Sequence, residues 1–201
     1  MDKNNIICFK NESSVQIYDQ NSKLQYQWAK NFIKKYNNQT AKTILDVGCG
    51  TGRITSTILA KKWPDAKITG IDLNNTMIIF AQKKYGYMQN INFEVADIEI
   101  FKTDTKYDLI FSCCCLQWLG DQTLALLNIK KMLTTNGNLL VVLPAKTSNS
   151  IFPIGHNLAQ SSKWSKYFTQ LQCVRSYYTE SEYICLLEKV GLTPQIISIK
   201  N

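Results

Sequence analysis

Two kinds of hydrophobic pattern alternate along this chain of 201 residues. Short apolar runs, typical of buried strands, are separated by segments whose apolar residues fall on one side of a helix. In residues 76–85, for example, Met77, Ile78, Phe80 and Ala81 form such a side. The pattern predicts a strand that begins at residue 43, strands over 67–71, 91–95, 107–112, 138–143 and 195–199, and helices over 24–36, 54–62, 76–85, 124–133 and 179–190.

Strand and helix alternate from residue 43 to the end, and this order predicts the fold class. A chain of this kind forms a mostly parallel, twisted sheet with helices on both faces. The predicted class is therefore α/β, in a single domain over 1–201. Within it we expect an N-terminal arm over 1–40, a core over 41–143, an irregular, aromatic-rich insert over 144–178, and a last helix and strand over 179–201.

Residues 43–52 carry the most informative motif of the chain. They read Thr-Ile-Leu-Asp-Val-Gly-Cys-Gly-Thr-Gly, an apolar run that ends in an acid and continues into three alternate glycines. Glycine allows a tight turn where the backbone passes close to a ligand, and Asp46 stands at the strand end, where open α/β sheets bind ligands. A helix that begins near Gly52 would point unpaired N–H groups at the same place. The motif predicts a nucleotide or nucleoside site. The alternative is a glycine turn in an ordinary α/β domain.

Polar residues also close the later predicted strands: Asp72 the second, Asp97 the third, and Ser112 with Cys113 the fourth. Because the ligand crevice of an open sheet runs along the carboxyl ends of its strands, we expect these residues to line one site. A carboxylate at Asp72 has two acceptor oxygens and can satisfy both hydroxyls of a ribose. Taken singly, Asp72 could be an acid at a helix N-terminus and Asp97 a turn residue.

The glycine spacing separates two kinds of nucleotide turn. Dinucleotide folds require G-x-G-x-x-G, whereas here the bulky Arg53 follows Gly48, Gly50 and Gly52. G-x-G-x-G preceded by an acid resembles motif I of the class I methyltransferases that use S-adenosylmethionine. The resemblance implies that the turn holds the methionine part of this cofactor. It also implies cofactor contacts from Asp46, Gly48, Cys49, Gly50, Gly52, Asp72 (ribose), Leu73 (adenine face), Asp97 (adenine amino group), Ile98 (beside the ring), Ser112 and Cys113.

Two further segments resemble one subgroup of that family. Residues 116–118 read Leu-Gln-Trp, and residues 18–25 read Tyr-Asp-Gln-Asn-Ser-Lys-Leu-Gln. Both are similar to segments of methyltransferases that act on carboxylates, among them trans-aconitate methyltransferase, the malonyl-carrier-protein methyltransferase of biotin synthesis and insect juvenile hormone acid methyltransferase. The aromatic residues at 163–168 and 177–178 are also similar, so the resemblance covers nearly the whole chain from about residue 9. It implies O-methylation of a small or carrier-protein-linked carboxylic acid.

By this resemblance Gln25 and Trp118 orient the substrate carboxylate, Tyr18 closes over the cofactor, and Gln117 is a further candidate. The chemistry agrees, because a carboxylate is ionised at pH 7 and needs no general base. Amide and indole N–H groups orient a carboxylate oxygen without an ion pair that would quench it. In the alternative interpretation Trp118 only packs under the insert, and Tyr18 and Gln25 are surface residues.

Charged and ligating residues narrow the choice of partners. Arg175 is a candidate partner for a second acidic group of the substrate, whereas His156 is interpreted as a polar residue of the insert. One histidine and no C-x-x-C pair argue against zinc, so no metal is expected. The net charge of +8 would suit RNA, but the lysines are scattered in pairs such as Lys34-Lys35, typical of wet helix faces. A nucleic-acid partner is therefore not expected.

The cysteines and the apolar stretches bear on the compartment. The chain has seven cysteines, an odd number that includes the run 113–115, and this favours reduced, buried thiols in the cytoplasm. No apolar stretch reaches the roughly 20 residues that span a bilayer. The N-terminus is polar and lacks the apolar middle of a secretion signal.

The chain departs from the family pattern at its C-terminal end. Class I methyltransferases usually finish with a seventh, antiparallel strand, whereas only Lys200 and Asn201 follow Ile199. We therefore expect the last strand to be missing or truncated. Two alternatives to carboxyl methylation stay open. One is an RNA or protein methyltransferase, although the Asn/Asp-Pro-Pro-aromatic motif of many amino-group methyltransferases is absent. The other is a catalytically impaired module that only binds the cofactor.

Overall fold

The centre of the fold is strand β1 (Thr43–Val47), which pairs in parallel with β2 (Lys67–Asp72) and with β4 (Tyr107–Cys113). Strand β3 (Ile91–Val95) pairs in parallel with β2, and β5 (Leu133–Val142) pairs in parallel with β4. The strand order is β3-β2-β1-β4-β5. The order reverses between β1 and β4, so the carboxyl ends of the central strands face one crevice at the switch point. This confirms the predicted parallel α/β sheet.

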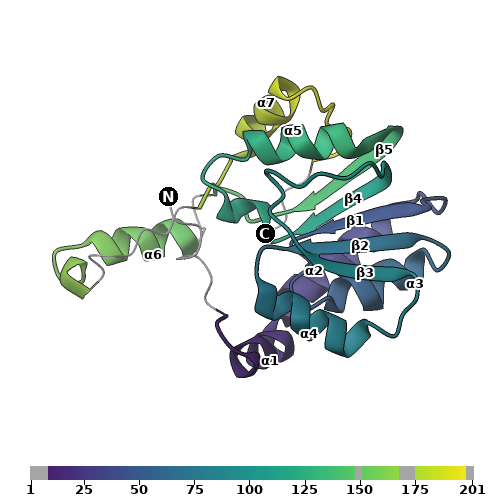
Figure 1. Cartoon of the computed structure of the whole chain (residues 1–201). Coiled ribbons are helices and arrows are strands. Elements are labelled where there is room, and N and C mark those ends of the chain that lie inside the picture. The colour runs from purple at the N-terminus through teal and green to yellow at the C-terminus, as the bar shows by residue number, and fades with distance from the viewer. Residues whose placement is uncertain (1–8, 148–150, 168–174, 198–201) are drawn as a thin grey trace.

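Helices cover both faces of the sheet, with α2 and α4 on one side and α5 and α7 on the other (Figure 1). The computed structural model describes residues 9–147, 151–167 and 175–197. Its helical elements are α1 (Glu12–Asn21), α2 (Lys23–Lys35), a π-helical turn η2 (Thr55–Leu59) that continues into α3 (Ala60–Lys62), α4 (Asn75–Tyr85), a 3-10 turn η3 (Leu116–Trp118), α5 (Thr123–Met132), α6 (Ile151–Gln160), a 3-10 turn η4 (Ser165–Tyr167) and α7 (Glu180–Lys189).

Alternation along the strands builds a separate apolar layer on each face. In β1, Ile44 packs with residues of α2, α3 and α4, whereas Leu45 and Val47 pack with residues of α5. Successive side chains of a strand point to opposite faces, so one short strand serves both layers. The sheet is thereby held between two helical layers, and its strand ends are left to build a site.

Helix α1 lies in the segment that we expected only as a polar arm. Asn11 caps it, accepting a hydrogen bond from the Ser14 backbone N–H at 2.9 Å, and the Ser14 side chain faces back to the Asn11 backbone. Such a reciprocal cap satisfies N–H groups that would otherwise lack partners. On α1 only Val15 and Asp19 are buried. The hydrophobic pattern did not predict this helix, because the helix has so few buried apolar residues.

The predicted end of the sheet needs two corrections. Strand β5 begins at Leu133 and not at residue 138, because Leu133 pairs with Tyr107 before an irregularity in the register between Tyr107 and Leu109. The strand predicted over 195–199 is absent from residues 195–197, and residues 198 and 199 lie outside the described residues. Ile196 is 86% exposed, so this short apolar run has no neighbouring strand to pack on.

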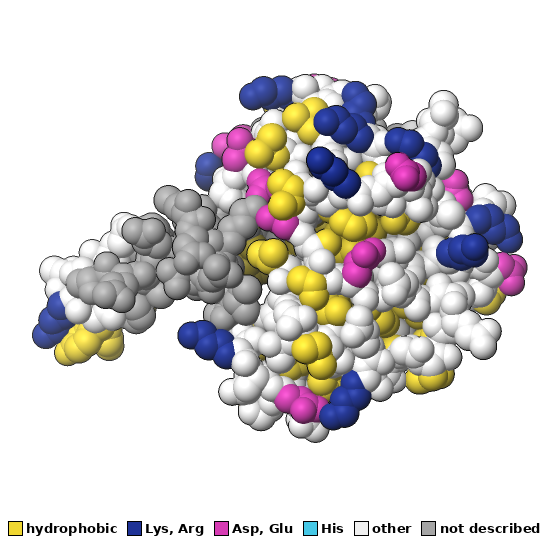
Figure 2. Space-filling model, in the orientation of Figure 1, with side chains coloured by type: hydrophobic (Ala, Val, Ile, Leu, Met, Phe, Trp, Pro, Cys, Tyr) yellow, Lys and Arg dark blue, Asp and Glu magenta, His cyan; other side chains and the backbone are white. Residues whose placement is uncertain are grey.

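The insert also differs from the expected irregular structure, since it contains helix α6, which projects away from the sheet (Figure 1). Figure 2 shows that lysine and arginine side chains on the visible face are dispersed among acidic ones and are not gathered in one patch. This distribution agrees with the interpretation of the lysines as solvated helix faces. Over the described ranges, no helix has the length and apolar character needed to cross a membrane.

Candidate functional site

The glycine turn is fastened to the strand beside it. The backbone N–H groups of Gly48 and Cys49 both donate to the Ile71 carbonyl oxygen, at 2.8 and 3.0 Å. The φ angles of Gly48, Gly50 and Gly52 are +74°, +54° and +71°. Residues with a Cβ atom adopt this left-handed region only at a cost of about 1–2 kcal/mol each. Three alternate glycines are therefore what this turn requires.

The surroundings of the three glycines differ. A Cβ atom on Gly48 would lie 2.3 Å from the Cys115 side chain, and one on Gly52 would lie 2.7 Å from the Phe93 ring. These two glycines allow close packing inside the protein. A Cβ atom on Gly50 would meet nothing within 4 Å, so the backbone of Gly50 faces open space. This is the arrangement expected where a turn receives a ligand.

Asp72 closes β2 directly across from the turn. Its Oδ2 accepts a hydrogen bond from the Gly50 N–H at 2.9 Å, and its Oδ1 accepts one from the Asn74 N–H at 2.8 Å. Burial raises the pKa of this carboxyl, while the two N–H groups act in the opposite direction. Each carboxylate oxygen has a second lone pair. The carboxylate can therefore accept hydroxyl donors of a ribose while it keeps its hold on Gly50.

Asp46 lies deeper, at 2% exposure. Its Oδ2 accepts a hydrogen bond from the Thr55 hydroxyl at 2.6 Å. Burial raises the pKa of Asp46 to about 7, the Thr55 hydrogen bond lowers it, and the neighbouring Asp72 raises it further. A buried acid that titrates near neutrality stabilises a nearby positive charge when it ionises, as a sulfonium would require.

The other predicted cofactor residues lie in three different settings. Leu73 is 42% exposed beside Asp72. Asp97 is half-buried after β3, and its Oδ1 accepts the Glu99 N–H at 3.0 Å. Ile98 is buried in the apolar layer with Leu45, Val47 and Ile71, and Ser112 is fully buried and donates its hydroxyl to the Val47 carbonyl at 3.0 Å. Because the side chains of Ile98 and Ser112 are buried, these residues can contact a ligand mainly through their backbone atoms.

The cysteine run lies at the end of β4. Cys113 is buried, and its Sγ is 3.9 Å from that of Cys114. The hydrogen bond with Cys114 and burial both raise the pKa of the Cys113 thiol. Cys114 has φ +55°, a strained conformation for a residue with a side chain, and its N–H donates to the Val142 carbonyl. The five cysteines at 49, 113, 114, 115 and 185 are free thiols.

A small cavity of about 40 Å³ joins the glycine turn to the N-terminal helices. Tyr18 of α1 and Gln25 of α2 line it, together with Gly48, Gly50 and Cys113. Both helix residues are half-buried, so neither is a plain surface side chain. Burial, with the nearby Cys114 and Asp72, raises the pKa of Tyr18 to about 12. Its hydroxyl therefore stays protonated at neutral pH and acts as a neutral donor.

Trp118 and its neighbours form a second group of contacts, separate from this cavity. The Arg175 guanidinium stacks 3.7 Å above the centroid of the Trp118 ring, a close cation–π contact. Gln117 is buried, and its backbone carbonyl accepts the Ser176 N–H at 2.9 Å. Trp118 does not line the cavity that holds Tyr18 and Gln25. The side chain of His156 lies outside the described residues.

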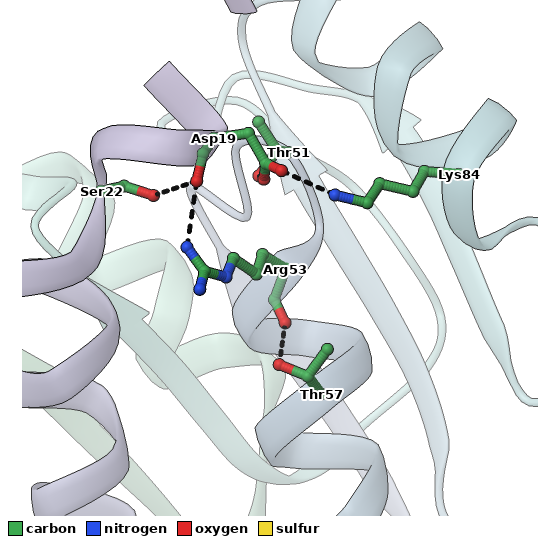
Figure 3. Close-up of polar contacts among 6 residues, drawn as sticks. All are labelled: Asp19, Ser22, Thr51, Arg53, Thr57 and Lys84. Carbon is green, nitrogen blue, oxygen red and sulfur yellow. Dashed lines mark hydrogen bonds and ion pairs between the residues drawn. The ribbon is translucent and has the colours of Figure 1, made fainter. Parts of the chain in front are cut away.

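Sequence reasoning did not single out Asp19, which is buried beside the turn. Its carboxylate accepts the Thr51 hydroxyl at 2.6 Å and pairs with the Lys84 ammonium at 2.6 Å (Figure 3). The Arg53 guanidinium donates to the Asp19 backbone carbonyl at 3.0 Å. Asp19 lies four residues after Val15, on the buried side of α1. No signal in the sequence identified it, because the hydrophobic pattern did not predict α1 and so did not show which side of the helix is buried.

Known proteins resemble this chain over much of its length. Residues 38–191 match the family described as methyltransferase domain. Protein 235L of Invertebrate iridescent virus 6, named as a methyltransferase, is 28% identical over 188 residues, which are 94% of this chain and 69% of that protein. A malonyl-[acyl-carrier protein] O-methyltransferase of Bacillus cytotoxicus is 36% identical over 127 residues, which are 61% of this chain and 44% of that protein.

Solved structures agree on the fold. Human N-acetylserotonin methyltransferase superposes with a TM-score of 0.65 at 18% identity, over 90% of this chain and 51% of that one. At this identity the likeness concerns the fold alone. The chain spans between about a third and a half of the length of the malonyl-carrier-protein relatives that it matches.

Proposed function

This chain belongs to the methyltransferase-domain family, and on that premise we propose that it transfers a methyl group from S-adenosylmethionine to the carboxylate of a small or carrier-protein-linked acid. The chain is a class I S-adenosylmethionine-dependent methyltransferase, as the glycine turn predicted. What the proposal adds is the chemical nature of the methyl acceptor. The observation that supports it is the cavity beside the glycine turn, which Tyr18 and Gln25 line.

The residues of the turn suit this cofactor. Gly50 presents its backbone to open space, and the Asp72 carboxylate beside it retains acceptor capacity for ribose hydroxyls. Asp46 supplies a buried negative charge when it ionises. When bound, S-adenosylmethionine supplies an electrophilic methyl group on a positively charged sulfur. We assign the cofactor to these residues and to Asp97 and Leu73 farther along the strand ends.

The acceptor is argued from the protonation of the cavity residues. Tyr18 keeps its proton at neutral pH because burial raises its pKa to about 12, and the Gln25 amide is neutral at every pH. Both are donors and neither is a general base at pH 7. A hydroxyl or ammonium acceptor would need such a base, whereas a carboxylate arrives ionised. Alignment of the oxygen near the methyl group can supply several kcal/mol of the barrier.

The identity of the substrate acid is argued from the positive charge of Arg175 and from the names of the bacterial relatives. Arg175, which stacks on Trp118, is the candidate partner for a second acidic group of the substrate. The bacterial relatives are named for a malonyl group on an acyl-carrier protein. We propose the cytoplasm as its location, in agreement with the free thiols of the described residues.

The proposal is tested by the chemical stability of the product. We would measure binding of S-adenosylhomocysteine by calorimetry and then transfer of labelled methyl groups to malonyl-carrier protein, free dicarboxylates and a short RNA. The expected product is a methyl ester, which mild alkali hydrolyses to volatile methanol. Label that resists alkali, or that enters only RNA or protein amines, would overturn the carboxylate assignment. Binding without transfer to any acid would favour a module that only holds the cofactor.

A further inference from the structure

The N-terminal helices are tied to the glycine turn through one buried carboxylate. Asp19 on α1 receives the Thr51 hydroxyl on Oδ1 and the Lys84 ammonium on Oδ2, each at 2.6 Å. Thr51 stands between Gly50 and Gly52, and Lys84 is on the last turn of α4. The Asp19 side chain is only 10% exposed. Hydrogen bonds to buried charged groups are the strong ones, so these contacts define where α1 sits.

A second set of contacts holds the backbone at the same point. The Arg53 guanidinium donates to the Asp19 carbonyl oxygen at 3.0 Å and stacks over the Tyr26 ring of α2, 4.4 Å from its centroid. The Thr57 hydroxyl donates to the Arg53 carbonyl at 2.6 Å (Figure 3). Arg53 directly follows the glycine turn. Residues 51–53 therefore contact both α1, through Asp19, and α2, through Tyr26.

These contacts flank the two residues on which the proposed function depends. Tyr18 precedes Asp19 in the chain, and Gln25 lies in the first turn of α2, three residues after Ser22, whose hydroxyl donates to the Asp19 carbonyl at 3.3 Å. We propose that Asp19 is a positioning residue of the active site, which clamps the α1–α2 pair to the glycine turn and so sets Tyr18 and Gln25 over the cofactor site. This inference rests on the proposed function for the roles of Tyr18 and Gln25.

The size of the cavity adds a dynamic consequence. Ligand pockets that enclose a molecule of this size take several hundred Å³, whereas the cavity between the turn and the helices is about 40 Å³. The cofactor therefore does not fit within this cavity alone, and we expect any weakening of the contacts of Asp19, which we call the Asp19 clamp, to speed its entry and exit. Lys84 is 40% exposed, so one arm of the clamp is accessible to water and can release.

The chain offers a matched control for this idea. Lys83, the residue before Lys84, also joins α4 to α1 through an ion pair, with Glu12 at 2.7 Å. That pair is 70% and 65% exposed, and pairs of this kind contribute little. A clamp effect predicts that Lys84→Gln and Lys83→Gln differ, although both remove one lysine from the same helix turn. A general effect of charge predicts that they behave alike.

Thr51 allows the same comparison at the other arm. Thr51→Val keeps the volume but removes the hydroxyl, and Thr51→Ser keeps the hydroxyl. We would measure backbone hydrogen exchange of α1 and α2 without cofactor, the dissociation rate of S-adenosylhomocysteine, and kcat and KM with a methyl acceptor. In Thr51→Val and Lys84→Gln we expect exchange in α1 and cofactor dissociation to be faster by about ten-fold, with kcat reduced. Thr51→Ser, which keeps the hydroxyl, should rescue most of the loss seen in Thr51→Val, and Lys83→Gln should match the unmodified protein.

The outcomes separate the clamp from the proposed function. Unchanged exchange and dissociation in Thr51→Val and Lys84→Gln would overturn the clamp, even if the protein methylates acids as proposed. A loss of protection throughout the sheet, with Thr51→Ser as damaging as Thr51→Val, would also overturn it, since that indicates a structural role only. If the unmodified protein does not bind S-adenosylhomocysteine, the proposed function is overturned, and the positioning role of Asp19 with it. The hydrogen-exchange data report on the contacts of Asp19 independently of this result.

Discussion

The Gly50 backbone N–H donates to the Asp72 carboxylate at 2.9 Å, which joins the glycine turn after β1 to the acid that ends β2. The two residues are 22 positions apart in the chain and meet because their strands are parallel neighbours, with Asp46 opposite Gly70 and Val47 opposite Ile71. The acid therefore orders the turn as well as offering acceptors to a ligand. Its replacement should affect both.

Asp72→Ala should weaken S-adenosylhomocysteine binding by about ten-fold or more. A hydrogen bond to a buried charged group is worth about 1.5–3 kcal/mol, and 1.4 kcal/mol is a factor of ten in affinity. Calorimetry measures the change. Asp65→Ala, at an exposed acid that pairs with Lys42, is the control and should bind normally. Equal affinities in the two variants would refute the ribose assignment of Asp72.

Gly48→Ala and Gly50→Ala should separate folding from binding. Both place a Cβ atom at positive φ, but only the Gly48 variant meets a neighbour, the Cys115 side chain at 2.3 Å. Overpacking costs about 1–3 kcal/mol beyond the backbone strain, so Gly48→Ala should melt at a clearly lower temperature. Gly50→Ala should fold and lose cofactor affinity, because its methyl group enters the open side of the turn. Thermal melts and calorimetry test this, and normal binding by Gly50→Ala would contradict it.

Asp46 should make stability depend on pH between about 4 and 7. Burial raises its folded pKa to about 7, above the unfolded value of about 3.9, so the native state binds the extra proton in this range. Its contribution is fully present below about pH 4 and is lost as the pH rises through 7. Asp46→Asn, which keeps an acceptor for Thr55, should raise the melting temperature at pH 8 and change it little at pH 4.5.

The same variant should discriminate between two ligands. S-adenosylmethionine carries a positive sulfur and S-adenosylhomocysteine does not, so removal of the Asp46 charge should weaken the first ligand more than the second. Competition binding at pH 8 measures the ratio. If Asp46→Asn lowers both affinities equally, the acid supports the turn and does not face the sulfonium charge.

Trp118→Phe should keep cofactor affinity and lower turnover. The change preserves a ring beneath Arg175 but removes the indole N–H proposed to orient the carboxylate. Steady-state kinetics with calorimetry on the same preparation separate the two effects. Weaker cofactor binding together with lower turnover would instead assign Trp118 to packing, as its position outside the cavity allows.

The patterns that sequence reasoning used were local or periodic. The alternation of strands and helices predicted the parallel sheet, and the spacing of Gly48, Gly50 and Gly52 predicted a tight turn, which their positive φ angles bear out. The position of Asp72 at a strand end predicted its place beside that turn, because carboxyl ends of parallel strands meet at one edge. Helix α1 was missed, since its stability depends on a cap and on contacts across the fold more than on an apolar stripe.

The sequence alone determined the sheet, the glycine turn and the family, because strand burial, backbone conformation and strand order follow from residue type and spacing. Only the tertiary structure decided that Asp19 joins Thr51 and Lys84, residues 32 and 65 positions away, and that α1 and α2 cover the turn. It also decided that Trp118 stacks on Arg175 outside the cavity of Tyr18 and Gln25. Such contacts depend on how side chains distant in the sequence pack in three dimensions, and the hydrophobic periodicity of the sequence does not predict them.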